Sequence, residues 1–304
     1  MHIFITGGNG FIGKHLGAAL LARGHVLTVT GTRPAASLPA NVTHIVADTT
    51  RPGKWQEAAA DAEVLINLAG RTIFKRWTKA HKQQMYDSRI LTTRHLVAAL
   101  PAGSNATLIS VSAVGYYGNR GEEVLSETEG AGTDFLAHLS QDWEMEALMA
   151  EQKGARVVIP RFGVVLGREG GALPNMMLPF KFFMGGPIGN GRHWISWIHV
   201  RDLTDALLHV MTDPACRGRY NFTAPEPVRY RDLASALGRA LNRPSFVRTP
   251  AFMIRLALGE MAGALLGSQR VLPRRLFEAG YGFQFPDITS ACADLVRHDF
   301  DETR

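Results

Sequence analysis

Three glycines near the N-terminus have the spacing of a phosphate-binding turn. Gly7, Gly10 and Gly13 follow a short apolar run and precede residues whose apolar positions have helical spacing. In such a segment the first glycine permits the tight turn, the second lets the backbone approach a pyrophosphate, and the third lets the helix pack on the strand. We expect Gly10 also to need a positive φ. The N–H groups at the helix start can hold phosphates, so the pattern predicts a dinucleotide site; a glycine turn without a ligand is the alternative.

The residues after the second expected strand indicate which dinucleotide fits. In the NAD version of this arrangement, an acidic side chain near this point accepts hydrogen bonds from the ribose. No Asp or Glu occurs between the glycine turn and Asp48, and Thr32 and Arg33 stand there instead. Because a guanidinium can pair bidentately with a 2′-phosphate, the pattern favours NADP(H); an unliganded surface arginine is the alternative. Asp48 either meets the adenine edge or caps the next turn.

The side chains that could move a proton follow another expected strand, residues 106–112. That strand ends at Ser112, and Tyr116 and Tyr117 follow within one short loop. Ligands of α/β proteins bind at the carboxyl ends of the strands, so we expect Ser112 to orient a substrate carbonyl or hydroxyl and one of the two tyrosines to donate a proton. His199 is a further candidate, although a histidine in an apolar strand is more often structural. A nicotinamide would carry the hydride.

The elements that must position these residues alternate between strand and helix. We expect strands near residues 3–5, 26–30, 42–47, 63–70, 106–112 and 156–160, separated by helices that include 55–62, 79–99 and one starting at 134. This order is typical of an α/β fold, a Rossmann doubly wound parallel sheet. After residue 167 the alternation breaks. We therefore predict an NADP-binding domain over residues 1–167, with returns from about 194–213, and a smaller C-terminal α+β substrate domain, mainly 168–304.

Three further expectations concern single segments. Asn67–Gly70 is a strand end with small residues, against which a cofactor can lie. Arg89, on the long helix, faces either solvent or a phosphate, and the sequence alone favours solvent. The apolar cluster that follows residue 175 is assigned to the core: Met176, Met177, Phe180, Phe182 and Phe183. Ala251–Gly267 contains Arg255 and Glu260, so it is too interrupted to span a bilayer and is expected to be a packed helix.

Composition narrows the class of protein. The chain has 304 residues, 46% of them hydrophobic, a formal charge of +6 and two cysteines. The basic residues are scattered, which favours anionic small ligands over nucleic acid. Two cysteines outside any Cys-x-x-Cys exclude a disulfide framework and fit a cytoplasmic protein. We expect a small-molecule substrate, no metal, no nucleic acid and no membrane; the sequence indicates no oligomeric state.

Several motifs together resemble a known family. The chain resembles extended short-chain dehydrogenases of the nucleotide-sugar epimerase type in Thr6-Gly7-Gly8-x-Gly10-Phe-Ile-Gly13, Asn67-x-Ala-Gly70 and Ser112. It is similar to one atypical branch, the "epimerase family protein" branch, sometimes labelled as cell-division inhibitors, in Ser112-Ala-x-Gly-Tyr-Tyr-Gly118, Trp143-Glu144, Gly163-Val-Val-Leu-Gly167 and Trp197-Ile-His199-x-x-Asp202. The resemblance runs from residue 2 to about 297.

The resemblance implies a Rossmann domain that binds NADP(H) and a small C-terminal domain. It places the nicotinamide beside the backbone near Pro160. Together with the expected strand ends, it assigns these residues to the cofactor: Gly7, Asn9, Gly10, Phe11, Ile12, Gly13, Thr32, Arg33, Asp48, Asn67, Leu68, Ala69, Gly70, Arg89, Ser110, Pro160 and Arg161.

The chain departs from this family where the family does its proton chemistry. Such enzymes carry Tyr-x-x-x-Lys at the head of the helix after the serine, and the lysine lowers the tyrosine pKa. Here that region reads Phe135-Leu-Ala-His-Leu-Ser-Gln141, and Tyr116 with Arg120 is the nearest imitation in the chain. We therefore expect an NADP(H)-dependent oxidoreductase or epimerase-like protein that is slow at best. The alternative is a non-catalytic NADP(H)-binding redox sensor.

Overall fold

A parallel sheet forms the centre of the molecule. The computed structural model describes residues 1–34, 39 and 41–296. The strands of this sheet are β1 (His2–Thr6), β2 (Val26–Gly31), β3 (Val42–Val46), β4 (Val64–Asn67), β5 (Thr107–Ser110), β8 (Arg156–Phe162) and β13 (Gly218–Phe222). They pair in parallel in the order β13-β8-β5-β4-β1-β2-β3, and β6 (Ser112–Ala113) also pairs with β8. This strand order confirms the predicted doubly wound α/β fold.

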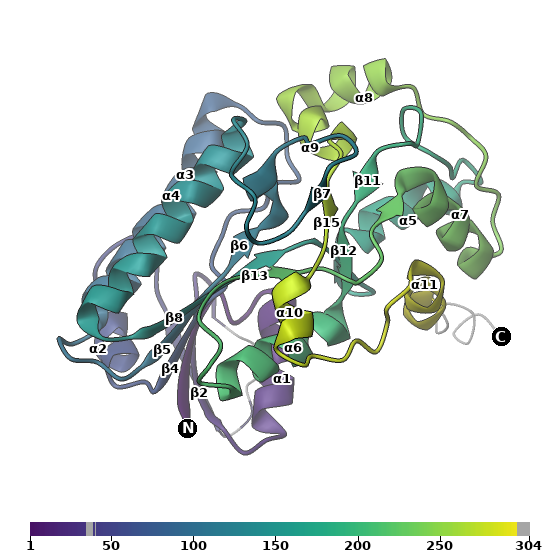
Figure 1. Ribbon diagram of the computed structural model, residues 1–304. Helices are drawn as coiled ribbons and strands as arrows, with labels where there is room; N and C mark the ends of the chain where they lie inside the picture. The colour runs from purple at the N-terminus through teal and green to yellow at the C-terminus, as the bar shows by residue number, and fades with distance from the viewer. Residues whose placement is uncertain (35–38, 40, 297–304) are drawn as a thin grey trace.

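Helices cover both faces of the sheet. Residues of α1 (Phe11–Leu21) and α6 (Val200–Thr212) pack on one face, and residues of α2 (Trp55–Ala60), α3 (Lys79–Ala99) and α4 (Phe135–Leu148) pack on the other. The described residues also form α5 (Leu173–Lys181), α7 (Tyr230–Leu241), α8 (Ala251–Leu258), α9 (Ala262–Leu266), α10 (Arg274–Glu278) and α11 (Ile288–Val296). The long helices α3 and α4 lie side by side on one face of the sheet (Figure 1). Side-chain oxygens of Thr78 and Asp134 cap their N-termini, which explains where both helices begin.

The strands are buried because alternate side chains enter two separate cores. Ile3 and Ile5 pack with Leu16 of α1 and Leu207 of α6 on one face. Phe4, Leu65 and Leu108 pack on the other face, with residues of α2, α3 and α4. Strands that are buried on both faces read as continuous apolar runs, which is why the sequence indicated them well.

A smaller C-terminal region lies beyond the sheet's edge. Its short strands are β9 (Val164–Gly167), β10 (Gly170–Gly171), β11 (Trp194–Ile195), β12 (Trp197–His199) and β14 (Val228–Arg229), while β7 (Val124–Leu125) pairs with β15 (Arg270–Val271). A third core joins α5, α7 and α11. The predicted domain boundaries stay a prediction, and β13, from the expected C-terminal part, belongs to the central sheet.

Two expectations about the C-terminal region were wrong. Met177 and Phe180 are buried, but Phe182 and Phe183 are 69% and 57% exposed, because α5 ends at Lys181 and the chain turns outward. The segment 251–266 is not one packed helix. Gly259, at φ +62°, separates α8 from α9, and α8 buries none of its residues. The sequence also predicts a terminal helix over residues 288–297; α11 covers Ile288–Val296, and residue 297 lies outside the described residues.

Candidate functional site

The glycine turn joins β1 to the N-terminus of α1 at the carboxyl edge of the sheet. Gly7 has φ +69°, a backbone region that favours glycine. A Cβ added to Gly13 would lie 2.4 Å from the carbonyl oxygen of Gly8, so Gly13 permits the close packing of helix on turn. Gly10 precedes α1 and provides no side-chain cap for it. The first amides of this 11-residue helix therefore face outward with the helix dipole, as an anion site requires.

Two details of the turn differ from the expectation. Gly10 has φ −74°, so the expected positive φ is wrong, and the left-handed residue is Gly7. An added Cβ at Gly10 would contact the carbonyl oxygen of Gly7 at 3.1 Å, and the residue is exposed. The ring of Phe11 packs against Gly167 and Gly170, where an added Cβ would lie 2.2 Å and 2.4 Å from it. The Phe11 side chain thus attaches the turn to the β9–β10 hairpin.

The predicted ribose and adenine residues lie at the ends of β2 and β3. Thr32 and Arg33 are exposed, and Arg33 forms no ion pair within the described part of the chain. The Asn9 amide contacts the His44 ring at 2.8 Å. Oδ1 of Asp48 accepts hydrogen bonds from the backbone N–H and the hydroxyl of Thr50, which lower the Asp48 pKa. Of the two readings of Asp48, the structure supports the turn cap.

Asn67 and Ser110 belong to a buried polar row under α3. The Asn67 amide donates to Thr93 Oγ1 at 2.8 Å and to Ser110 Oγ at 3.3 Å, and Asn67 Oδ1 accepts from Thr6 at 2.6 Å. The side chains of Asn67 and Ser110 are therefore occupied within the protein. The exposed edge that a cofactor can meet here is formed by the backbone of 68–70, where Gly70 is exposed and Leu68 and Ala69 are half-buried.

Arg89 faces the protein and not the solvent, which corrects the expectation from sequence. Its Nη1 donates to the carbonyl oxygens of Arg71 and Met85, both at 3.1 Å, and its guanidinium lies 5.2 Å from the ring centroid of Trp143. Burial lowers the Arg89 pKa to about 10, so the group stays charged at neutral pH. A Cβ on Gly70 would lie 3.0 Å from this guanidinium. A positive charge therefore lies directly beneath the strand end 67–70.

A buried ionic network lies at the ends of β6 and β8. Glu144 is almost fully buried, and its carboxylate accepts hydrogen bonds from Nε and Nη2 of Arg161 at 2.7 Å and 2.8 Å. Ser112 Oγ donates to the same carboxylate at 2.8 Å, and Arg219 Nε donates at 2.7 Å. The predicted role of Ser112 in orienting a substrate is not supported by this geometry, because the side chain is buried and its proton points to Glu144.

The two candidate tyrosines differ in how the buried network engages them. The Tyr117 hydroxyl is within 2.9 Å of Asn221 Oδ1, Ser126 O and Arg161 Nη1, and burial raises the Tyr117 pKa to about 12. Tyr117 is therefore held as a structural residue. Tyr116 is half-buried, and the Arg161 guanidinium lies 3.5 Å from its ring centroid. The Arg161 side chain thus serves this network and is not free to bind a cofactor. Pro160, one residue earlier, is buried in β8.

His199 is buried and makes its contacts within the protein. Its Nδ1 accepts a hydrogen bond from the backbone N–H of Arg201 and caps α6, its Nε2 lies 3.3 Å from Asp294 Oδ2, and its ring stacks on Phe285. Burial lowers the His199 pKa to about 4. Within the described residues, no hydrogen bond or ion pair joins His199 to Ser112, whose hydroxyl donates to Glu144. Arg120, the expected counterpart of the family's lysine, forms an ion pair with Glu123 at 2.8 Å.

The sequence analysis missed Glu144 as the centre of this network. A signal was present, because the buried positions of α4 include Ala137, Ser140, Glu144 and Ala147, which puts an acid in the apolar stripe of the helix. Arg219 and Asn221, from β13, gave no such signal. Their contacts depend on β13 pairing with β8, which no local pattern predicts.

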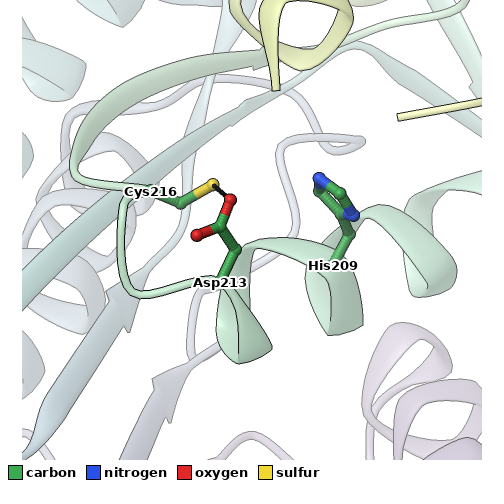
Figure 2. A group of neighbouring side chains, drawn as sticks. All are labelled: His209, Asp213 and Cys216. Atoms are coloured by element: carbon green, nitrogen blue, oxygen red, sulfur yellow. Dashed lines mark hydrogen bonds between the residues drawn. The ribbon is translucent and has the colours of Figure 1, made fainter. Parts of the chain in front are cut away.

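One group of potential metal ligands occurs in the described part of the chain. His209, Asp213 and Cys216 hold their ligand atoms within 4.8 Å of one another near the end of α6 (Figure 2). Nη1 of Arg156 donates to the carbonyl oxygens of Asp213 and Cys216, and the Cys216 thiol donates to Asp213 at 3.5 Å. A fixed guanidinium at this position disfavours a cation, so we propose no metal here.

Comparison with known proteins identifies relatives along the whole chain. Residues 3–222 match the model of the NAD dependent epimerase/dehydratase family, and residues 249–295 match a domain of unknown function, DUF1731. An epimerase family protein of Staphylococcus saprophyticus is 38% identical over 97% of this chain and 99% of its own length. A chloroplastic epimerase family protein of Arabidopsis thaliana, an SDR39U1 homolog, is 38% identical over 98% of this chain and 87% of its own length.

Solved structures share the fold. The human epimerase family protein SDR39U1, crystallised with NADPH, is 31% identical, with a TM-score of 0.87 over 98% of this chain and all of that one. A UDP-glucuronic acid 4-epimerase of Bacillus cereus, in complex with UDP-glucuronic acid and NAD, has a TM-score of 0.79 over 99% of this chain and all of that one, at 16% identity. The second likeness concerns the fold alone.

Among the described residues, no helix has the length and apolar content needed to cross a bilayer.

Proposed function

Because the chain belongs to the NAD dependent epimerase/dehydratase family, we propose that it binds NADP(H) and reduces a small carbonyl substrate. The observation that carries the proposal is the glycine turn, which leads into a helix N-terminus without a side-chain cap. Arg33, after the neighbouring strand β2, forms no ion pair with the described residues. Gly7, Gly10 and the first amides of α1 would hold the pyrophosphate. Thr32 and Arg33 would hold the 2′-phosphate, as a guanidinium suits a phosphate. The NADPH-bound human relative supports this assignment.

Tyr116 is the proposed proton donor. The bound nicotinamide supplies hydride, which leaves one proton to be delivered to the substrate oxygen. Tyr116 is half-buried, and the Arg161 guanidinium lies 3.5 Å from the centroid of its ring, a cation–π contact that holds the ring in place. Arg161 itself cannot exchange a proton at neutral pH. Ser112 positions Glu144, and Glu144 positions Arg161.

A redox sensor without catalysis is the second candidate function. The specific observation that favours it is that the hydroxyls of Ser112 and Tyr117 are both engaged inside the protein. In that case NADP(H) would bind, and no carbonyl compound would be reduced. Replacing Tyr116 with Phe separates the two functions, because it removes the proposed proton donor and should leave NADP(H) binding intact.

Arg33→Ala tests the choice of nucleotide. We expect the wild-type protein to prefer NADPH to NADH by about ten- to a hundredfold, since a charge-assisted contact to the 2′-phosphate contributes about 1.5–3 kcal/mol. The substitution should remove most of this preference and leave NADH affinity unchanged. Titration by nucleotide fluorescence measures both constants, with Arg51→Ala, also exposed, as a matched control. Equal affinity of the wild type for both nucleotides would contradict the assignment.

Gly10→Val tests the phosphate turn. The new side chain would stand where the pyrophosphate must approach, and we expect NADPH affinity to fall about a hundredfold, the equivalent of one or two charge-assisted hydrogen bonds. The protein should still fold, because Gly10 is exposed and its φ suits any residue. Gly13→Val, whose Cβ would lie 2.4 Å from the Gly8 carbonyl oxygen, should instead prevent folding. A folded Gly10→Val protein that keeps its NADPH affinity would show that the phosphates bind elsewhere.

A further inference from the structure

A cleft of about 720 Å³ opens in the C-terminal region. Its wall includes Asn119 and Gly121, which follow Tyr116 and Tyr117 in the chain by a few residues. Residues of α8, Ala251 and Arg255, line it as well. No residue of the glycine turn lines this cleft, whereas the loop that follows the proposed proton donor contributes to its wall.

Positively charged side chains outnumber free acidic ones in the lining of this cleft. Arg192, Arg248 and Arg255 line it, and none of the three forms an ion pair within the described residues. Arg248 donates to the Gly189 carbonyl oxygen, which fixes its position. The acid in the lining, Glu122, is already bound bidentately by Arg229 at 2.7 Å and accepts from Trp194. Three guanidinium groups that share one cleft repel one another, so an anion between them would relieve the repulsion.

The helix beside the cleft carries exposed apolar side chains, and these narrow the class of ligand. Phe252, Arg255 and Leu256 share one face of α8 by their i, i+3, i+4 spacing, and of these three Arg255 lines the cleft. Phe252 is 67% exposed and Leu256 is 81% exposed, and α8 buries none of its residues. An exposed apolar helix face beside a group of arginines fits a ligand that has an anionic head and an apolar chain.

We propose that this cleft binds a single-chain amphiphile with a phosphate head, held by Arg192, Arg248 and Arg255, and an apolar chain that lies along α8. Only one part of this inference rests on the proposed function, namely that the amphiphile is the substrate. To be reduced, such a substrate would also need a carbonyl group. The binding itself requires neither NADPH nor Tyr116.

The test measures binding of alkyl phosphates by calorimetry to the full-length protein with NADPH present, below their micelle concentration. From butyl to decyl phosphate, affinity should rise about two- to fourfold per methylene, according to how much of each is buried. Arg255→Gln should weaken every alkyl phosphate about tenfold and leave decanol unchanged. Leu256→Ser should flatten the dependence on chain length and leave inorganic phosphate unchanged. Arg23→Gln and Phe277→Ser, both at exposed positions away from the cleft, serve as matched controls.

Three outcomes would overturn the proposal. The first is no binding of any alkyl phosphate. The second is tight binding of UDP that Arg255→Gln weakens, with no dependence on alkyl chain length, which would make the cleft a nucleotide site. The third is binding to vesicles of phosphatidic acid without binding to monomeric alkyl phosphates, which would make α8 a membrane-contact surface. NADPH affinity, measured for each variant, reports on the proposed function separately, because loss of the amphiphile leaves it intact.

Discussion

Replacing Glu144 with Gln should lower the free energy of unfolding by about 3–5 kcal/mol, because it leaves the buried Arg161 guanidinium without its counterion. Glu144 and Arg161 each have a side chain that is 1% exposed, and the carboxylate also accepts hydrogen bonds from Ser112 and Arg219. The substitution keeps the size of the side chain and removes its charge. Urea unfolding followed by tryptophan fluorescence measures the change.

Glu146→Gln is the matched control for this effect. Glu146 is on the same helix and pairs with Arg94, whose side chain is 55% exposed. An exposed ion pair of this kind contributes about 0–1 kcal/mol, so this substitution should have little effect. A double substitution, Glu144→Leu with Arg161→Met, should recover much of the lost stability, since apolar residues can replace a buried pair without leaving a lone charge. Equal losses for Glu144→Gln and Glu146→Gln would contradict the proposed importance of the buried network.

Replacing Tyr116 with Phe should reduce the rate of NADPH oxidation by about 10²–10⁴-fold for whichever carbonyl compound the protein reduces, the usual range for loss of a general acid. The ring and its contact with the Arg161 guanidinium are kept, and the hydroxyl is lost. A screen of small carbonyl compounds, alkyl phosphates with a carbonyl and nucleotide-sugars, followed by single-turnover kinetics on the variant, measures the effect.

Tyr117→Phe separates catalysis from stability. Its hydroxyl is bound to Asn221, Ser126 and Arg161, so its loss should cost about 1–3 kcal/mol of stability, through buried partners left unsatisfied, and change turnover less than Tyr116→Phe does. A fast reaction that neither substitution slows would refute the assignment of the proton donor. Tight NADPH binding with no turnover on any compound would favour the sensor function.

The fold could be predicted because its signals are local. Strands such as β1 and β4 are buried on both faces, so they appear as unbroken apolar runs, and Thr78 and Asp134 mark the helix starts by side-chain caps. The glycine turn is equally local, since its three glycines and the helix after them lie within 20 residues. The sequence therefore determined the α/β class and the phosphate turn.

The tertiary structure decided which polar residues are free to act. Ser112, Tyr117 and Arg161 had the right types and positions for a site, but their hydrogen bonds are made with Glu144 and Asn221, which are distant in sequence. A side chain's availability depends on which partners the packing brings within about 3 Å, and strand pairing and helix packing set that over long sequence separations. For the same reason the group formed by Arg192, Arg248 and Arg255 is invisible in the sequence, since no spacing relates residues on segments that only the fold brings to one cleft.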